Sequence, residues 1–225
     1  MSWFDLSQAY DNDMPVGGRL PSPHFEPDQF SMPGGDGRIA YSKLAFASHV
    51  GTHVDAPWHH LEDGTRLEDL ALESFTGNGV VAHVNRVAGE AIQIDDVLGA
   101  GSVPGPGEML LIRTGWGRYF ESKDREHYVD APWLSSELIS WCVESGLRMV
   151  GTDTSTPEMP GSRRTPEYTM EAHHRLLGAG VLVAENLNLE SVPPGRYEIF
   201  AFPLRLPGGD GAPARIVARS ISSHD

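Results

Sequence analysis

The segment from Ser48 to His60, SHVGTHVDAPWHH, constrains this chain more than any other part of its sequence. It holds four of the ten histidines and one aspartate within thirteen residues. Imidazole and carboxylate groups are the ligands expected of zinc, manganese or iron ions. The segment therefore predicts a metal site with a catalytic histidine beside it.

The spacing of the candidate ligands favours an extended, bent segment. A helix would place Asp55 about 200° around its axis from His53, and Gly51 and Pro57 both oppose a helix. In a strand, His53 and Asp55 share one face, with Cα atoms roughly 7 Å apart. His49 and His53 would lie about 13 Å apart in a straight strand, which is too far for one ion. We therefore expect the chain to bend at Gly51.

A second group of candidate ligands lies in the other half of the chain. His173 falls near the end of an expected helix, and Glu185 falls at the end of the strand expected to follow it. A helix–loop–strand unit of this length brings its two ends together. His174 fits the spacing as well as His173 does. His60 is expected to support the site or to lie on the surface.

Hydrophobic periodicity predicts alternating strands and helices through the second half of the chain. We expect one domain spanning residues 1–225, with an α/β fold that contains a mixed sheet and flanking helices. The expected strands cover residues 38–47, 80–84, 109–112, 181–184, 199–206 and 214–218, with a further strand that starts at 149. The expected helices cover residues 94–99, 135–145 and 168–177.

Residues 1–37 are expected to form loops rather than regular elements. Prolines recur in this stretch, and residues 34–37 read Gly-Gly-Asp-Gly, which is a turn signal. We interpret the stretch as a proline-rich N-terminal arm or as a lid over a pocket.

Charge and composition exclude several classes of partner. The net charge of -14 repels phosphate backbones, so we expect no nucleic-acid partner. The N-terminus lacks a basic start and a long apolar run, and no segment reaches the length of a membrane span, so we expect a cytoplasmic protein that binds no membrane. The single cysteine, Cys142, lies in a helical pattern and is expected to be a buried thiol.

Several motifs resemble those of one family. HVGTHVDAPWHH resembles the HxGTHxDxPxH signature of the cyclase family, which includes bacterial kynurenine formamidases and isatin hydrolases. Shorter matches follow the family's order along nearly the whole chain. They are Asp5-Leu6-Ser7, Met14-Pro15, Gly151-Thr152-Asp153-Thr154, His173 with Leu176-Leu177, Glu185-Asn186-Leu187 and the segment PPGRYEIFAFPLRLPGGDGAPARIVA.

The resemblance implies a swivelling β/α/β-type fold and a homodimer or dimer-based homo-oligomer. It implies a catalytic histidine at His59. It also implies a divalent cofactor, zinc or manganese, because formamidase-like members hold two ions and isatin-hydrolase-like members hold one manganese. The implied ligands are His49, His53, Asp55, which bridges two ions, His173 and Glu185.

The implied reaction is arylformamidase-like hydrolysis of a carbon–nitrogen bond, other than a peptide bond, in a small aromatic substrate. A divalent ion lowers the pKa of bound water from 15.7 toward about 7, and we expect the resulting hydroxide to attack an amide carbonyl while His59 moves the proton. Trp58 and Phe46 are candidates for an apolar wall around the substrate. Thr156 is a candidate substrate contact, because it keeps a hydroxyl where the family often has serine. The downstream acid is Glu158, where the family has Asp-Pro.

Two other functions fit the same residues. The first is a hydrolase that opens a lactam or lactone ring, as isatin-hydrolase-like members do. The second is a non-catalytic protein with a structural metal. Structural zinc sites are usually closed by four protein ligands, often cysteines, and this chain lacks those cysteines.

Overall fold

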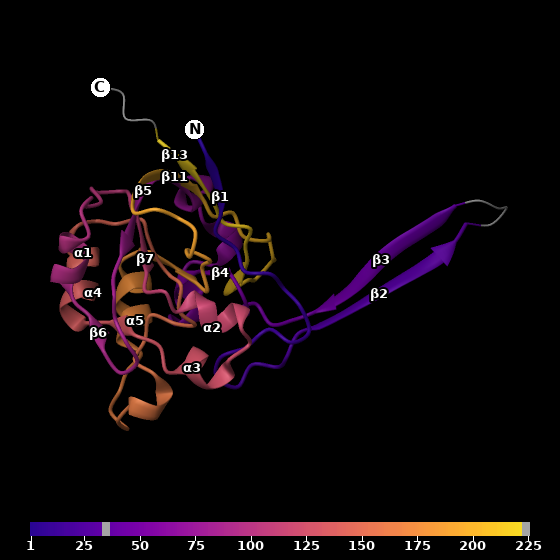
Figure 1. Cartoon of the computed structure of the whole chain (residues 1–225), viewed down its shortest axis with the longest axis horizontal. Helices are drawn as coiled ribbons and strands as arrows, with labels where there is room; N and C mark the ends of the chain where they lie inside the picture. The colour runs from indigo at the N-terminus through magenta and orange to yellow at the C-terminus, as the bar shows by residue number, and fades with distance from the viewer. Residues whose placement is uncertain (33–36, 222–225) are drawn as a thin grey trace.

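A nine-stranded mixed sheet forms the centre of the computed structural model, which describes residues 1–32 and 37–221 (Figure 1). Its strand order is β1-β13-β11-β5-β7-β9-β10-β4-β12. The four middle strands β5, β7, β9 and β10 run parallel, and antiparallel strands flank them on both sides. The strands are β1 (Trp3–Asp5), β4 (His53–Asp55), β5 (Thr76–His83), β7 (Met109–Arg113), β9 (Met149–Thr152), β10 (Leu182–Glu185), β11 (Gly195–Phe200), β12 (Gly211–Pro213) and β13 (Val217–Ser220).

Three helices cover one face of this sheet: α1 (Ile94–Gly99), α4 (Ser136–Glu144) and α5 (Glu171–Gly178). Side chains alternate along the parallel strands because successive residues point to opposite faces. On β7, Leu110 and Ile112 pack toward the helices, whereas Met109 and Leu111 pack into the core on the other face. Both faces of the middle strands are therefore buried, as parallel sheets require.

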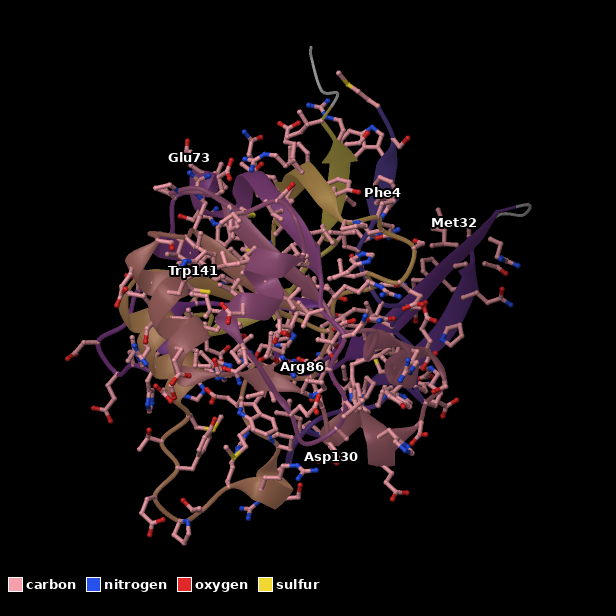
Figure 2. All side chains as sticks on the ribbon, turned by 60° about the vertical axis from the view of Figure 1, so that its left-hand side comes forward. Phe4, Met32, Glu73, Arg86, Asp130 and Trp141 are labelled. Atoms are coloured by element: carbon pink, nitrogen blue, oxygen red, sulfur yellow. The ribbon has the colours of Figure 1, made fainter. Side chains whose placement is uncertain are left out.

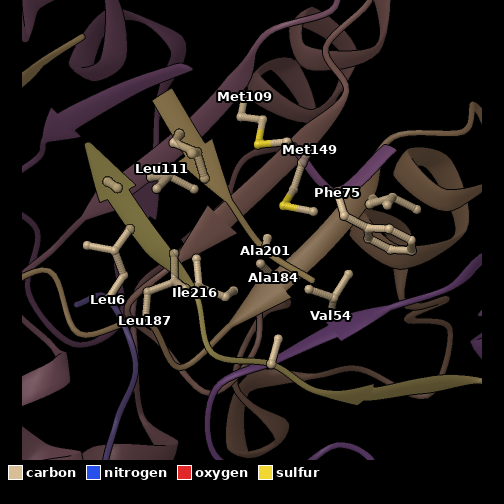
Figure 3. Packing of buried hydrophobic residues seen from close by; sticks show 14 of the residues in the cluster. Leu6, Val54, Phe75, Met109, Leu111, Met149, Ala184, Leu187, Ala201 and Ile216 are labelled. Carbon is tan, nitrogen blue, oxygen red and sulfur yellow. The ribbon is translucent and has the colours of Figure 1, made fainter. Parts of the chain in front are cut away.

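The core on the second face contains residues from strands near both edges of the sheet. Val54 and Ala212, from β4 and β12, belong to the same buried cluster as Ile199 and Ala218, from β11 and β13. Figure 3 shows this cluster, with Met109, Met149 and Ala184 among its members. A flat sheet would keep its outer strands apart, so the sheet curls around this core.

The helix predicted for residues 135–145 is confirmed. Its N-cap Ser135 accepts a hydrogen bond from the backbone N–H of Leu138 at 3.2 Å, and Gly146 follows its C-terminus with φ +64°. The helix predicted for 168–177 begins later, at Glu171. Met170 adopts a left-handed conformation with φ +55°, so the helix cannot extend back through it.

The predicted strand over residues 199–206 is wrong in its second half. β11 begins at Gly195 and ends at Phe200, where Ala201 donates to the carbonyl of Phe75. Beyond it, Pro203 has no N–H for a ladder and forms only an isolated bridge with Ala214. The strand expected at 214–218 instead covers Val217–Ser220.

Several short elements were not expected from the sequence. They are the helices α2 (Gly117–Glu121) and α3 (Arg125–Val129), the strand pair β6 (Ala91–Ile92) and β8 (Trp133–Leu134), and the 3-10 turns η1 (Pro57–His59) and η4 (Gly161–Arg163). Two further 3-10 turns, η2 (Leu67–Asp69) and η3 (Leu72–Phe75), form between η1 and β5.

The expectation that residues 1–37 form only loops is wrong. β2 (His24–Ser31) and β3 (Arg38–Ala45) pair along their full length in an antiparallel hairpin, which projects from the body of the molecule (Figure 1). Met32 follows β2 and stands away from the body in Figure 2. Pro27 fits into β2 because a two-stranded ribbon leaves outer backbone groups free. The turn predicted at 34–37 lies largely outside the described residues.

Within residues 1–32 and 37–221, no helix combines the length and the apolar character that a membrane crossing needs.

Candidate metal and catalytic centre

The chain bends at Gly51 before it enters β4, as the spacing of the histidines predicted. Gly51 has φ +58°, and a Cβ atom there would lie 2.6 Å from the Tyr10 ring. Glycine suits both constraints, since it tolerates positive φ and lacks a Cβ. The carbonyl of Gly51 accepts a hydrogen bond from His53 Nδ1 at 2.8 Å. The bend thus directs the other ring nitrogen of His53, Nε2, away from the backbone.

The register between β4 and β10 gathers three candidate ligands on the helix-covered face of the sheet. Glu185 lies opposite His53, and Val54 between His53 and Asp55 points into the core on the other face. His173 reaches this face from α5. It shares a stripe with Leu176 and Leu177, which pack on the sheet at offsets of three and four residues.

The donor atoms of His53, Asp55, His173 and Glu185 converge at ligand spacing. Nε2 of His53 lies 3.3 Å from Asp55 Oδ1 and 3.4 Å from Glu185 Oε2. Nε2 of His173 lies 3.5 Å from Asp55 Oδ2 and 3.2 Å from Glu185 Oε1. Two ligands about 2.0 Å from a tetrahedral zinc ion are separated by about 3.3 Å. These separations therefore match the spacing of donors around a metal ion.

Two of these atoms, His53 Nε2 and Asp55 Oδ2, are buried and have no hydrogen-bond partner among the described residues. Both side chains are 1% exposed. A buried polar atom without a partner costs about 1–3 kcal/mol, so a protein rarely keeps two at one point unless a ligand satisfies them. Imidazole nitrogen together with carboxylate oxygen is a donor set suited to zinc and manganese. The cluster fits a divalent metal.

His49 and His59 lie beside this cluster. His49 Nδ1 is 2.7 Å from Asp55 Oδ1, and His49 Nε2 is 2.9 Å from Asp210 Oδ2. The His59 ring stacks on the His49 ring at 3.7 Å between centroids, and its Nδ1 is 3.8 Å from Asp210 Oδ2. The turn η1 presents His59 here, with Pro57 at its start.

The carboxylates of the cluster favour the protonated, positively charged forms of His49 and His173. Burial opposes charge on His49, but Asp55 and Asp210 outweigh it and raise its pKa to about 9. Burial also opposes charge on His173, yet Asp55, Glu158 and Glu185 raise its pKa well above the ordinary value. A bound cation would likewise compensate the negative charge of these carboxylates.

Burial prevails at His59 and His60. It lowers the pKa of His59 to about 3 and that of His60 to about 4, so both imidazoles are neutral at pH 7. The His60 ring stacks on His173 at 4.4 Å between centroids. His174 points outward and is exposed, so the fold brings His173, rather than His174, to the cluster.

The three residues predicted to contact a substrate, Trp58, Thr156 and Phe46, each contact other parts of the chain. The Trp58 ring lies under the Arg66 guanidinium, whose carbon is 3.8 Å from the ring centroid. The Thr156 hydroxyl accepts the backbone N–H of Glu158 at 3.3 Å. Phe46 stands apart, packed against Tyr10. Their roles toward a substrate stay predictions.

Phe46 lines an apolar cavity of about 500 Å³ at the base of the hairpin, together with Tyr10, Phe25 and Leu44. Pro213 also lines it and pairs with His53 across the β12–β4 edge. Other residues than the candidate ligands form this cavity.

Sequence reasoning missed Asp210 and the contacts of Glu158. Asp210 lies in the segment Gly208-Gly209-Asp210-Gly211, whose sequence is typical of a turn and indicates no ligand. Glu158 accepts the backbone N–H of His173 and lies beside its ring. The available signals were an acidic residue in a glycine turn and an acid in the loop that follows β9. Neither signal names a partner.

The chain is similar to known proteins over most of its length. Residues 4–159 match the family model described as Putative cyclase. A kynurenine formamidase from Salinibacter ruber is 36% identical over 182 residues, which cover 80% of each chain. A kynurenine formamidase from Bacillus mycoides is 30% identical over 226 residues, 97% of this chain and 98% of that one. Isatin hydrolase A from Labrenzia aggregata, solved with bound benzyl benzoate, is 25% identical, with a TM-score of 0.79 over 96% of this chain and 93% of that one.

Proposed function

The chain belongs to the cyclase family, and from that premise we propose that it is a metal-dependent hydrolase of carbon–nitrogen bonds other than peptide bonds. The observation that carries this proposal is the convergence of His53, Asp55, His173 and Glu185 at the donor spacing of a metal site. The proposed substrate is a small aromatic N-formyl amide. The similarity to kynurenine formamidases along nearly the full chain supports that class.

The proposed cofactor is zinc or manganese, as one or two ions in each subunit. Asp55 presents one oxygen toward His49 and His53 and the other toward His173, which suits a carboxylate that bridges two ions. The proposed ligands are His49, His53, Asp55, His173 and Glu185.

A divalent ion held by these residues would supply an acidified water and positive charge for the polarisation of a substrate carbonyl. The proposed role of His59 is proton transfer. Its neutral imidazole accepts a proton, and the same ring then donates it to the leaving nitrogen. Asp210, 3.8 Å from His59 Nδ1, faces the ring on the side of that nitrogen.

One experiment tests metal dependence and reaction class together. The purified protein is assayed with N-formylkynurenine and with isatin, as isolated, after chelation, and after Zn²⁺ or Mn²⁺ is returned. We expect hydrolysis of the formamide, loss of activity on chelation and recovery with metal. Activity that survives complete metal removal would contradict the proposal.

Ring opening is the second candidate function. The similarity in fold to isatin hydrolase A favours it, since the same cluster could serve a cyclic amide carbonyl. Faster turnover of isatin than of the formamide would select this candidate. A purely structural metal has less support, because the one cysteine, Cys142, is buried in α4 within the apolar cluster between the helices and the sheet and is not a candidate ligand.

The proposed assembly is a homodimer in which the hairpin of β2 and β3 covers a second copy. All eight residues of β3 are exposed, and the apolar side chains Phe30 and Leu44 are 51% and 59% exposed. An isolated two-stranded hairpin is at best marginally stable in water. Contact with another chain would bury these side chains and pair or cover the free strand edges.

A further inference from the structure

Glu158 is a buried carboxylate that makes three contacts around one candidate ligand. Its side chain is fully buried. Oε1 accepts the backbone N–H of His173 at 2.8 Å and lies 2.8 Å from His173 Nδ1. Oε2 accepts the hydroxyl of Tyr168. Glu158, in the loop after β9, thus connects Tyr168, which precedes α5, to the backbone and the imidazole of His173.

The first of these contacts caps a helix. α5 begins at Glu171, so His173 is its third residue, and its N–H has no partner within the helix. The N-cap position, Met170, offers no side-chain hydrogen bond. Glu158 supplies the missing acceptor from fifteen residues earlier in the chain, and its charge also suits the positive end of a helix. The start of α5 therefore depends on this carboxylate.

The second contact selects which ring nitrogen of His173 faces the cluster. Nδ1–H donates to Glu158, which leaves Nε2 directed at Asp55 and Glu185. An imidazole binds a metal through an unprotonated nitrogen, and a carboxylate on the opposite nitrogen fixes the tautomer and makes the ring a stronger donor. Oε1 of Glu158 therefore influences the position, the orientation and the basicity of the His173 ring.

We propose that Glu158 is a positioning residue for His173, which it holds as an Nε2 donor and thereby strengthens the binding of a divalent cation, and that Tyr168 holds Glu158 in place. The inference rests on the proposed metal site. Tyr168 completes the link from outside the cluster: its hydroxyl also accepts the backbone N–H of Met159 at 3.1 Å. Arg164 lies over its ring, 5.2 Å from the centroid.

The test compares Glu158→Gln with Glu171→Gln in the full chain. A glutamine at 158 keeps an oxygen for the His173 N–H and an amide for the Tyr168 oxygen, so it removes the charge while the cap remains. Glu171 is a matched control in the first turn of the same helix. It contacts Ser136 and Arg175 rather than His173. Zn²⁺ affinity is measured by competition with a chromophoric chelator, and thermal unfolding is measured on the metal-free protein.

We expect Glu158→Gln to weaken Zn²⁺ binding about 10–100-fold, the loss typical of removing such a supporting carboxylate. Any fall in the free energy of unfolding of the metal-free variant should be smaller than the lost free energy of Zn²⁺ binding. Glu171→Gln should bind Zn²⁺ normally. Unchanged affinity in Glu158→Gln would overturn the inference. A loss of affinity matched by an equal loss of metal-free stability in that variant would also overturn it, since this would indicate a structural role alone.

Tyr168→Phe provides a second variant, because it removes the hydroxyl that holds Glu158 and leaves every candidate ligand in place. We expect a severalfold loss of Zn²⁺ affinity with the fold retained. Normal affinity in this variant would exclude the part given to Tyr168. If the unchanged protein bound neither Zn²⁺ nor Mn²⁺, the proposed metal site itself would be wrong, and the inference would fall with it.

Discussion

Asp55 is the residue on which the cluster converges. Its Oδ1 lies 2.7 Å from His49 Nδ1 and 3.3 Å from His53 Nε2, and its Oδ2 lies 3.5 Å from His173 Nε2. Burial favours the neutral acid, but these three imidazoles hold the pKa of Asp55 well below its ordinary value. It is therefore a permanent negative charge at the point where a cation is expected.

Replacement of Asp55 by asparagine should remove that charge and one bridging oxygen. We expect at least a tenfold loss of bound metal, measured as ions per chain by elemental analysis after dialysis. Asp63→Asn, at an exposed position in the turn after His60, is the control and should keep its metal. Full metal content in Asp55→Asn would show that the ion binds elsewhere.

Substitution of His59 should impair proton transfer without impairing metal binding. We expect His59→Ala to retain its metal but to lose about 10²–10⁴-fold in kcat, the usual contribution of general acid–base catalysis. Metal content and turnover are measured on the same preparation. His174→Ala, which removes an exposed imidazole, should leave both unchanged. A fully active His59→Ala variant would end the role proposed for His59.

The sequence could group candidate ligands where they lie in one short segment. His49, His53 and Asp55 share a run of seven residues, and the bend at Gly51 followed from their spacing alone. Asp210 could not be placed in this way. It reaches His49 only because β12 pairs with β4, a contact between segments that no local pattern records.

At the scale of elements, a buried aspartate joins two strand ends. Asp153, directly after β9, accepts the backbone N–H groups of Thr114 at 2.9 Å and Gly115 at 2.8 Å, after the end of β7. It also accepts the Thr114 hydroxyl at 2.6 Å. Burial raises the pKa of Asp153 and outweighs these hydrogen bonds. The carboxylate fixes the turn that leads into α2.

Asp153→Asn should weaken this turn, because its amide nitrogen would face backbone N–H groups instead of accepting from them. An unsatisfied buried donor costs about 1–3 kcal/mol, so we expect the free energy of unfolding to fall by about that amount. Urea denaturation followed by circular dichroism measures it. The exposed substitution Asp63→Asn should change stability by less than about 0.5 kcal/mol. Equal stability of the two variants would contradict the role given to Asp153.

Helices and strands could be predicted from the sequence where their hydrophobic pattern is long enough to recognise. The nine-residue α4 carries its own cap and apolar stripe, and the strands of the parallel sheet read as short apolar runs. The five-residue helices α2 and α3 are too short for a helical period, so tertiary packing decides them. The start of α5 escaped prediction for a related reason, since its capping acid, Glu158, lies outside the helix.

At the scale of the whole molecule, the hairpin is the part least explained by the chain's own core. Phe30 and Ile39 are cross-strand partners, and both are exposed. If the hairpin covers a second copy, the double substitution Phe30→Ser and Ile39→Ser should shift the mass in solution from two chains toward one. Light scattering after size-exclusion chromatography measures that mass.

Leu72→Ser is the matched control, because Leu72 is 69% exposed in η3, outside the hairpin. It should leave the assembly unchanged. A monomeric unchanged protein, or a double variant that stays dimeric, would contradict the proposed role of the hairpin. The sequence predicted the second strand of this hairpin, over residues 38–47, but not the first, because the prolines before it suggested loops. Neither the pairing of the two strands nor their projection from the body depends on a buried apolar face.

The position of β4 in the sheet also sets an order of events during synthesis. The strand that carries His53 and Asp55 lies between β10 and β12, which the ribosome makes more than a hundred residues later. Until those strands emerge, the first ligands have no neighbours to align them, and a preformed site rarely exists in an unfolded chain. We therefore expect metal capture to be one of the last steps of maturation, and a polypeptide truncated before residue 211 to carry the complete histidine motif without the strand β12 that pairs with it.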